Sequence, residues 1–404
     1  MKSLFWVFLC LFAAVASAAE VTIDAQFPGG NIIVDSIQGD VVHLRPDLRT
    51  SPDWFYYAFR VKNAEGKTLR FVFERENRIG PRGPAISTDE GKTWRYLSSK
   101  PNASSKEFTY VFGPEEKSVR FALAILYTQK DWEAFVAPYR TRSDVRLTTL
   151  CKSRKGRDVE LLRVGEKNPN TRFAVVLTSR HHCCEMIATL VMEGILQQVL
   201  SDDETGKWLR ANAEFFFVPF MDKDGVEDGD QGKNRTPHDH NRDYNHEIYP
   251  EVKALKAQTV QNFAAKELVF LDLHCPWLRY GRNESIYFPM PSYLRAAEQS
   301  APYFKLLEKC QKSGALPYHV SDNLPFGKEW NTSANYEKLE DGKPTASSKM
   351  WAAEQPNAVL VASLEIPYSN VSNVEVTREN CREFGHSMAK ALAAFLKAPQ
   401  KSGE

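Results

Sequence analysis

The sequence has little excess charge of either sign, and it has no long hydrophobic run after its first residues. Its 404 residues include 52 lysines and arginines against 51 aspartates and glutamates. Because the basic and acidic residues nearly balance, the chain has no general attraction to nucleic acid or to an anionic membrane surface, and we expect neither as a partner. No later apolar stretch is long enough to cross a bilayer, and no internal repeat, low-complexity tract or proline-rich linker divides the chain.

The first residues have the composition of an export signal. Lys2 precedes an apolar run at residues 4–15, and Ala-Ser-Ala at 16–18 fits a small-x-small cleavage site. The apolar run is too short for a comfortable membrane span, which leaves an uncleaved anchor as the weaker alternative. We therefore expect a signal peptide at residues 1–18 and a secreted or periplasmic protein.

The segment from residue 20 to about 130 has the pattern of β structure. Short alternating or aromatic runs such as WFYYAFRVK, TLRFVFE and SVRFALAILY recur between glycine, proline, asparagine and aspartate. This spacing is typical of an antiparallel sandwich, so we expect an all-β sandwich domain over residues 19–135. Residues 87–94 (STDEGKTW) fit an Asp-box, and because a propeller would need several copies, a structural hairpin is the favoured interpretation.

From about residue 140 the pattern changes to alternating buried strands and helices. Strands are predicted at 171–179, 213–220, 267–274 and 357–366, and helices at 185–200, 251–266 and 379–397. This alternation predicts an α/β catalytic domain at residues 140–400, with a mostly parallel mixed sheet flanked by helices. Such sheets bind ligands beyond the carboxyl ends of their strands, where the polar clusters of this sequence fall.

A histidine and a glutamate three residues apart, His182 and Glu185, follow a predicted strand and open a helix. A catalytic zinc site needs three protein ligands and one open position, and zinc accepts both imidazole nitrogen and carboxylate oxygen. His274 ends the strand predicted at 267–274, and a parallel sheet brings that end to the same rim. We therefore predict one Zn²⁺ ion held by His182, Glu185 and His274.

Two other metal arrangements stay open at this point. His181 with Cys184 is also spaced for metal binding, although the hard carboxylate of Glu185 better suits a hydrolytic site. The second is the cluster His238, Asp239 and His240, for which a solvated loop that positions the next two residues is favoured.

Six cysteines follow the expected cleavage site, and three of them (Cys183, Cys184 and Cys275) adjoin candidate metal ligands. Export would expose them to oxidising conditions, but no disulfide connectivity can be derived from the sequence. A small buried side chain is the favoured role for the three.

Two further residues suit amide hydrolysis. Glu365 ends the apolar run VLVASLEI, and an ionised glutamate buried there needs a partner, which a neighbouring metal would provide. Arg242 offers a planar fork that matches a carboxylate with two hydrogen bonds.

In this order the residues resemble the zinc carboxypeptidase family, which carries HxxE, then Asn-Arg, then histidine, then a glutamate on a late strand. The matching residues are His182, Glu185, Asn241, Arg242, His274 and Glu365. The segments PFMDKDGVEDGD, NRDYN and LEIPYS are similar to the family's as well. The sequence looks closest to the cytosolic carboxypeptidase-like branch, which places a β sandwich before the catalytic domain. Because we expect an export signal, the resemblance does not imply the cytosolic location or the tubulin substrate of that branch for this protein.

The resemblance implies roles for individual residues. Glu365 would be the general base and acid, and Asn241 with Arg242 would bind the terminal carboxylate of the substrate. The family's oxyanion-stabilising arginine has no clear counterpart, so Lys233 and Arg235 are both candidates. The family's substrate-covering tyrosine has none either, and Trp330 and Tyr336 are the candidates.

The resemblance implies hydrolysis of the C-terminal amide bond of peptides or peptide-like cell-wall fragments. A deacylase or peptidoglycan amidase on the same scaffold is the nearest alternative. A secreted binding protein with a vestigial metal site is the other. Nothing in the sequence indicates the oligomeric state.

Overall fold

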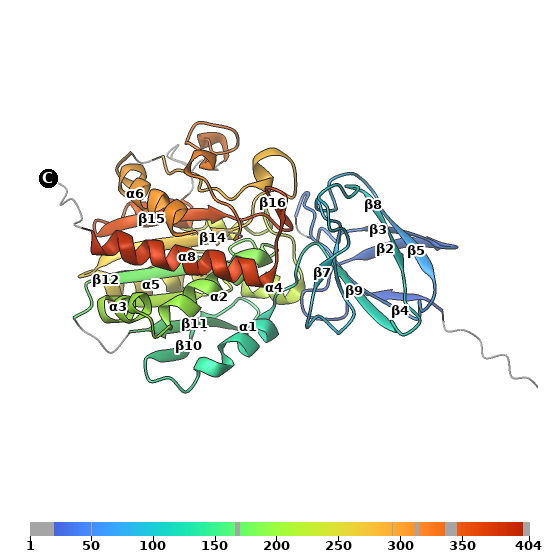
Figure 1. Ribbon diagram of the computed structural model, residues 1–404, viewed down its shortest axis with the longest axis horizontal. Helices are drawn as coiled ribbons and strands as arrows, with labels where there is room; N and C mark the ends of the chain where they lie inside the picture. The colour runs from blue at the N-terminus through green and yellow to red at the C-terminus, as the bar shows by residue number, and fades with distance from the viewer. Residues whose placement is uncertain are drawn as a thin grey trace, which may run out of the picture.

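The computed structural model describes residues 20–49, 51–165, 170–292, 294–311, 315–335 and 346–398. The predicted signal peptide and Tyr336 therefore lie outside the described residues. Figure 1 shows two parts side by side, an all-β part at one end and a larger α/β part at the other, with β16 and α4 on the side that faces the β part.

The β part consists of two sheets that enclose an aromatic core. One sheet has the order β1-β4-β9-β6-β7 and the other β2-β3-β5-β8; all pairs are antiparallel except β3 with β5. Phe59 and Phe121 of the first sheet contact Phe71 of the second, with ring centroids 5.6 and 5.3 Å apart. The strands are β1 (Thr22–Asp24), β2 (Ile33–Gln38), β3 (Val41–Arg45), β4 (Ala58–Lys62), β5 (Thr68–Phe73), β6 (Ala85–Ser87), β7 (Arg95–Tyr96), β8 (Glu107–Val111) and β9 (Ser118–Ala122).

The Asp-box segment forms the hairpin between β6 and β7. The Asp89 carboxylate accepts hydrogen bonds from the backbone N–H and the hydroxyl of Thr93, and the Trp94 indole N–H donates to the carbonyl of Gly91. These local bonds close the turn, as expected of a structural hairpin.

The α/β part is built on a mixed sheet of order β10-β11-β13-β12-β14-β15. The four strands β12 to β15 are mutually parallel, and an antiparallel hairpin, β10 with β11, extends one edge. The strands are β10 (Val145–Lys152), β11 (Asp158–Val164), β12 (Phe173–Ser179), β13 (Ala213–Val218), β14 (Glu267–His274) and β15 (Ala358–Glu365), with a small separate pair, β16 (Asn370–Val371) and β17 (Val374–Glu375).

Helices cover both faces of this sheet. Since successive strand residues point to opposite faces, Val175 and Leu177 join a core with α2 and α8, whereas Val176 joins a second core with α5. Figure 1 shows α2 and α8 together in front of the sheet. The helices are α1 (Gln129–Val136), α2 (Met186–Val199), α3 (Glu204–Asn212), α4 (Lys223–Asp228), α5 (Pro250–Phe263), α6 (Leu294–Cys310), α7 (Ser348–Ala353) and α8 (Arg378–Lys397).

Direct hydrogen bonds join the two parts. The side-chain amide of Gln231 pairs with both backbone groups of Tyr56, at 2.8 and 2.9 Å. The Asn31 amide donates to the carbonyl of Gly229 at 2.7 Å, and the Arg279 guanidinium donates to that of Ile79 at 3.0 Å. In each of these hydrogen bonds, a side chain of one part bonds to a backbone group of the other part.

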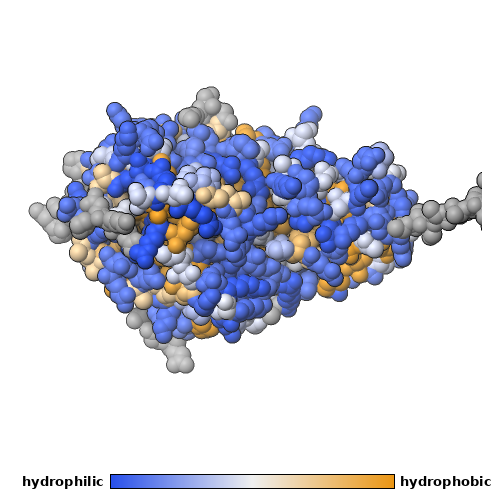
Figure 2. All heavy atoms as spheres, turned by 90° about the horizontal axis from the view of Figure 1, so that it is seen from below, coloured by the Kyte–Doolittle hydropathy of each residue, from blue (hydrophilic) through white to orange (hydrophobic). Residues whose placement is uncertain are grey.

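The surface is largely polar where it can be seen. Figure 2 shows a mostly hydrophilic face across both parts, with small separate hydrophobic patches. Among the residues that the structure describes, none of the helices combines the length and the apolar character needed to span a bilayer.

Two glycines allow α2 and α8 to cross at close range. A Cβ on Gly194 would lie 2.0 Å from the carbonyl oxygen of Arg382, and a Cβ on Gly385 would lie 2.2 Å from that of Val191. Contacts this short cannot exist, so any larger residue would force the two helices apart.

We therefore expect Gly385→Ala to lower the free energy of unfolding by about 1–3 kcal/mol, the usual cost of overpacking. This loss would occur although alanine favours helix over glycine by about 1 kcal/mol. Urea unfolding measures the change, with Gln261→Ala on the exposed face of α5 as the control, which we expect to stay within about 0.5 kcal/mol. An unchanged or raised stability of Gly385→Ala would contradict the close crossing.

Candidate metal centre and active site

The predicted metal ligands come together at the carboxyl ends of two neighbouring parallel strands. His182 lies in the loop between β12 and α2, Glu185 is the residue before α2, and His274 is the last residue of β14. The Nδ1 atoms of His182 and His274 lie 2.9 and 2.7 Å from the two carboxylate oxygens of Glu185. Donor atoms of the three residues all lie within 4.8 Å of one another, and all three side chains are buried.

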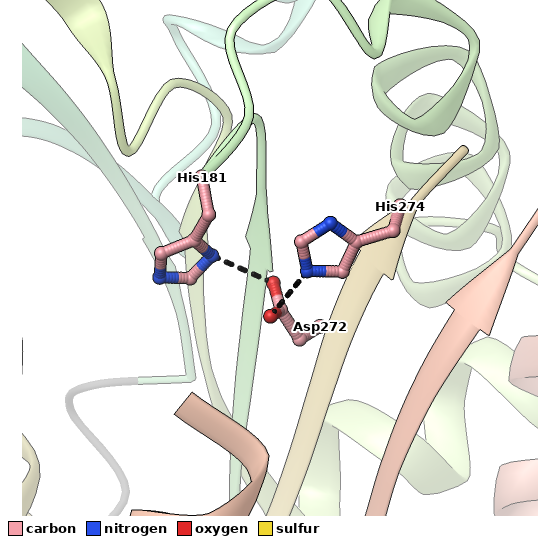
Figure 3. A group of neighbouring side chains, drawn as sticks. All are labelled: His181, Asp272 and His274. Carbon is pink, nitrogen blue, oxygen red and sulfur yellow. Dashed lines mark hydrogen bonds and ion pairs between the residues drawn. The ribbon is translucent and has the colours of Figure 1, made fainter. Parts of the chain in front are cut away.

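A second group of donors shares His274 (Figure 3). The Asp272 carboxylate faces His181 Nδ1 at 2.9 Å with one oxygen and His274 Nε2 at 2.7 Å with the other. The far nitrogen of His181, Nε2, lies 2.8 Å from the hydroxyl of Tyr244. The side-chain hydroxyls of Thr178 and Ser348 also donate to Asp272, so its oxygens already accept several hydrogen bonds.

The cavity distinguishes the two groups. A cavity of about 290 Å³ opens over His182, Glu185 and His274, whereas His181 and Asp272 are not among the described residues that line it. Two imidazoles and a carboxylate that face an open cavity fit a catalytic zinc ion, which needs a free position for water and substrate. Asp272 then suits the carboxylate that orients a metal-bound histidine from behind, and His181 supports Asp272.

The electrostatics of the first group also fit a cation. Burial opposes a charged imidazole, yet the nearby Glu185 and Asp239 carboxylates outweigh burial and raise the pKa of His182 to about 9. Burial likewise opposes an ionised Glu185, but the two histidines lower the pKa of its carboxyl to about 2. The surrounding carboxylates therefore favour positive charge at this position, which a metal ion would supply.

Glu365 lies beside the metal group because it ends β15, where it is in register with His274 on β14. Its backbone is fixed by two hydrogen bonds with that of Tyr287, at 2.9 and 3.2 Å. Burial raises the pKa of its carboxyl to about 7, although the neighbouring His274 acts in the opposite direction. One carboxylate oxygen of Glu365 is buried and accepts no hydrogen bond from the described residues, so it can still accept a proton.

Asn241 and Arg242 lie on a short 3₁₀ helix, η2 (His240–Arg242), which Asp239 caps. Both residues line the cavity. The Arg242 guanidinium donates to the carbonyl of Asn335 from two nitrogens, at 3.2 and 3.3 Å. The Asn241 amide lies 2.9 Å from Nε2 of His274, so this residue also contacts the metal group directly.

The other histidines of the His238–His240 cluster point elsewhere. His240 stacks on Tyr249 and pairs with Glu251 at 3.0 Å, while His238 lies 3.1 Å from the carbonyl of Arg242. This arrangement agrees with a loop that positions Asn241 and Arg242.

The two candidates for oxyanion stabilisation differ in position. Lys233 lines the cavity, and its ammonium group donates to the side chain of Asn335 at 2.8 Å. Arg235 is not among the described residues that line the cavity; its guanidinium pairs with Asp222 and lies 3.1 Å from the sulfur of Cys183. The geometry therefore favours Lys233 and gives Arg235 a structural contact instead.

Of the two candidates for covering the substrate, Trp330 lines the cavity, where its indole N–H donates to the hydroxyl of Tyr287 at 3.2 Å. Tyr336 is outside the described residues. The six cysteines among the described residues are free thiols, and burial raises the pKa of Cys184 to about 12, so this thiol is no nucleophile near neutral pH.

The structure adds residues that the sequence did not indicate. Tyr287, Lys349 and Trp54 line the cavity, and Lys349 is buried with its ammonium group 2.7 Å from the carbonyl of Pro289. Burial lowers the pKa of Lys349 to about 8. The role of Asp272 could have been predicted from the sequence. It is an ionisable residue in an apolar strand, two positions before His274, and therefore lies on the same face of the sheet as His274.

Comparisons with known proteins agree with this site. Residues 134–269 match the family model described as zinc carboxypeptidase. The chain is 23% identical to cytosolic carboxypeptidase 2 of Xenopus tropicalis over 93% of its own length and 42% of the relative. It is 25% identical to cytosolic carboxypeptidase 6 of Caenorhabditis elegans over 64% of its length and 63% of the relative. The chain thus spans about half the length of these curated relatives.

A solved structure shares the whole fold. The metallo-carboxypeptidase from Burkholderia cenocepacia superposes with a TM-score of 0.76 at 20% identity, over 93% of this chain and 99% of that one. A buried two-histidine, one-glutamate centre at the edge of this mixed sheet is typical of a metallohydrolase. The chain contains a zinc carboxypeptidase domain. The predicted fold class is confirmed. The domain limits 19–135 and 140–400 stay predictions, and helix α1 (Gln129–Val136) extends across the first limit, at residue 135.

The two donor groups predict different results when one histidine is replaced. We expect His182→Asn to remove most of the zinc, because it deletes a ligand. His181→Asn should keep the metal and lower its affinity about 10–100-fold, the usual effect of losing an outer partner. Metal content after dialysis and competition with a chelator measure both effects. The opposite order of the two variants would assign the metal to His181, Asp272 and His274.

Proposed function

We propose that the protein is a zinc carboxypeptidase that removes the C-terminal residue of peptides or peptide-like cell-wall fragments. The observation that supports this most is a single cavity that is lined by the metal group, Glu365 and Arg242. Arg242 would bind the free carboxylate of the substrate at a fixed distance from the metal, and that distance would select the last amide bond.

The side chains fit the steps of amide hydrolysis. A zinc ion held by His182, Glu185 and His274 would polarise the scissile carbonyl and acidify a water molecule. Glu365 accepts the proton of the attacking water and later passes it to the leaving amine, and its register with His274 places it where both transfers occur. Lys233 supplies positive charge in the same cavity, where it can stabilise the developing oxyanion.

The lining of the cavity also suggests a preference for the terminal residue. Lys233, Arg242 and Lys349 place three cationic side chains in a cavity of modest size. After one of them has bound the terminal carboxylate, positive charge remains for an acidic side chain. We therefore favour substrates that end in glutamate or aspartate over those that end in lysine.

The two alternative functions, a deacylase or amidase and a binding protein with a vestigial metal site, have less support. A deacylase or amidase would share the metal group but would not need an arginine in the cavity to pair with a terminal carboxylate. A vestigial site would have no reason to keep Glu365 buried beside three intact ligands, because an unused buried carboxylate is costly. Secretion or periplasmic export, with an N-terminal signal peptide, is part of this proposal.

Glu365→Gln should keep the zinc ion and abolish most of the hydrolysis. The amide has nearly the same shape but cannot accept the proton, and loss of a general base typically lowers kcat by about 10²–10⁴-fold. Zinc content and peptide hydrolysis are measured on the same preparation, with the exposed Glu329→Gln as control. Full activity of Glu365→Gln would assign the base to another residue.

Free and amidated peptides test the role of Arg242. The wild-type enzyme should cleave a peptide with a free C-terminal glutamate at least about 100-fold faster than its amide, because an amide gives Arg242 no charge to pair with. Arg242→Ala should raise KM for the free peptide and reduce this discrimination, whereas the exposed Arg95→Ala should change neither. Equal cleavage of both peptides by the wild type would favour an amidase or deacylase.

A further inference from the structure

One wall of the cavity comes from the β sandwich. Trp54, in the segment before β4, lines the cavity together with the metal ligands, whereas every other described residue that lines it lies at position 182 or beyond. The Trp54 indole N–H donates to the sulfur of Cys184 at 3.3 Å, and Cys184 directly precedes Glu185. The sandwich therefore reaches the immediate neighbourhood of the metal group.

Trp54 is half of an aromatic pair. Its ring lies edge-on to that of Trp277, with centroids 5.0 Å apart and an angle of 87° between the planes. Phe55 packs against both rings, at 5.0 Å from Trp54 and 4.9 Å from Trp277. Trp277 lines the cavity and remains 38% exposed, although it follows the ligand His274 by only three residues. The pair thus offers apolar surface to the cavity next to the metal group.

The segment that carries Trp54 is also held in place by its neighbours. The side-chain amide of Gln231 pairs with the backbone N–H and carbonyl of Tyr56, two residues after Trp54. Phe55 is fully buried and contacts Tyr368, with centroids 5.8 Å apart. A rigid aromatic surface loses little conformational entropy when it binds a ligand, so it is well suited to recognition.

Two cationic side chains of the cavity are directed toward the same residue, Asn335. Lys233 and Arg242 both donate hydrogen bonds to Asn335, one to its side chain and the other to its carbonyl. The aromatic pair contacts the segments of Cys184 and His274, as described above, and Trp54 also lies beside Gly232, the residue before Lys233. A substrate whose C-terminal residue lies against the two cationic side chains, with its last amide bond at the metal, would direct the preceding residue toward the aromatic pair.

We infer that Trp54 and Trp277 form a subsite for the side chain that precedes the scissile bond, and that this subsite selects aromatic side chains. The inference rests on the proposed carboxypeptidase function. Edge-to-face packing and burial of a flat apolar ring would favour phenylalanine or tyrosine over alanine at this position. The sandwich domain is then part of the specificity of the enzyme.

Two acylated dipeptides that differ only in the residue before a C-terminal glutamate test the subsite. The zinc-loaded wild type should show a kcat/KM at least about tenfold higher for phenylalanine than for alanine at that position. The difference should lie mainly in KM. Trp277→Ala should bring the ratio close to one, and Trp277→Phe should retain most of it. Trp94→Ala should leave the ratio unchanged, because Trp94 is not among the described residues that line the cavity. Trp54→Phe, the conservative substitution in the sandwich, should lower the ratio less than Trp277→Ala does.

Binding separates this inference from the proposed function. On the zinc-loaded Glu365→Gln protein, calorimetry of the same two dipeptides should show tighter binding of the phenylalanine compound, and Trp277→Ala on that background should remove the advantage. If the wild type hydrolyses neither compound while the binding preference holds, the proposed function fails and the subsite stands. If hydrolysis proceeds without a preference, or the preference survives Trp277→Ala, the subsite is overturned.

Discussion

The parallel alignment of β12, β14 and β15 is the constraint on which the candidate site depends. The chain leaves β12 toward His182 and Glu185, His274 ends β14, and Glu365 ends β15. Because neighbouring parallel strands end at the same edge of a sheet, three segments that are far apart in sequence bring these four residues together. A shift of β15 by one residue would turn Glu365 to the opposite face.

Behind that edge, Asp272 links the strand ends to the core. Its carboxylate is fully buried, and two histidines with two hydroxyl groups face it. Two neighbouring histidines outweigh the cost of burial and hold the pKa of Asp272 well below its usual range. A charge held in this way orients His274 from behind and leaves the other ring nitrogen directed toward Glu185.

Much of the catalytic domain could be predicted, since its strands are continuously apolar and its motif residues fall at strand ends. The strands observed at 173–179 and 267–274 agree closely with those predicted, and the intact order of the motif indicated the family. The helix at 294–310 was not predicted; it contains Pro302, which normally counts against a helix interior.

The choice between Lys233 and Arg235 could not be made from sequence. Asn234 lies between them with a φ of 56°, in the left-handed region, so the backbone turns sharply there and sends the two side chains to different places. Trp54, Tyr287 and Lys349 were missed for a related reason. They reach the cavity from the sandwich, from a loop and from the short helix α7, where neither periodicity nor spacing relates them to the metal motif.

The pairing of Gln231 with Tyr56 gives the sandwich a role that its position at one end of the molecule conceals. A side-chain amide that bonds both backbone groups of one residue behaves like a short additional strand, and it fixes the sandwich against the segment that carries Lys233. A catalytic domain separated from its sandwich would lose the wall beside Cys184 and would admit bulk water behind Glu185. Shortening the chain to its α/β part would therefore remove Trp54, and with it part of the cavity wall beside the metal group.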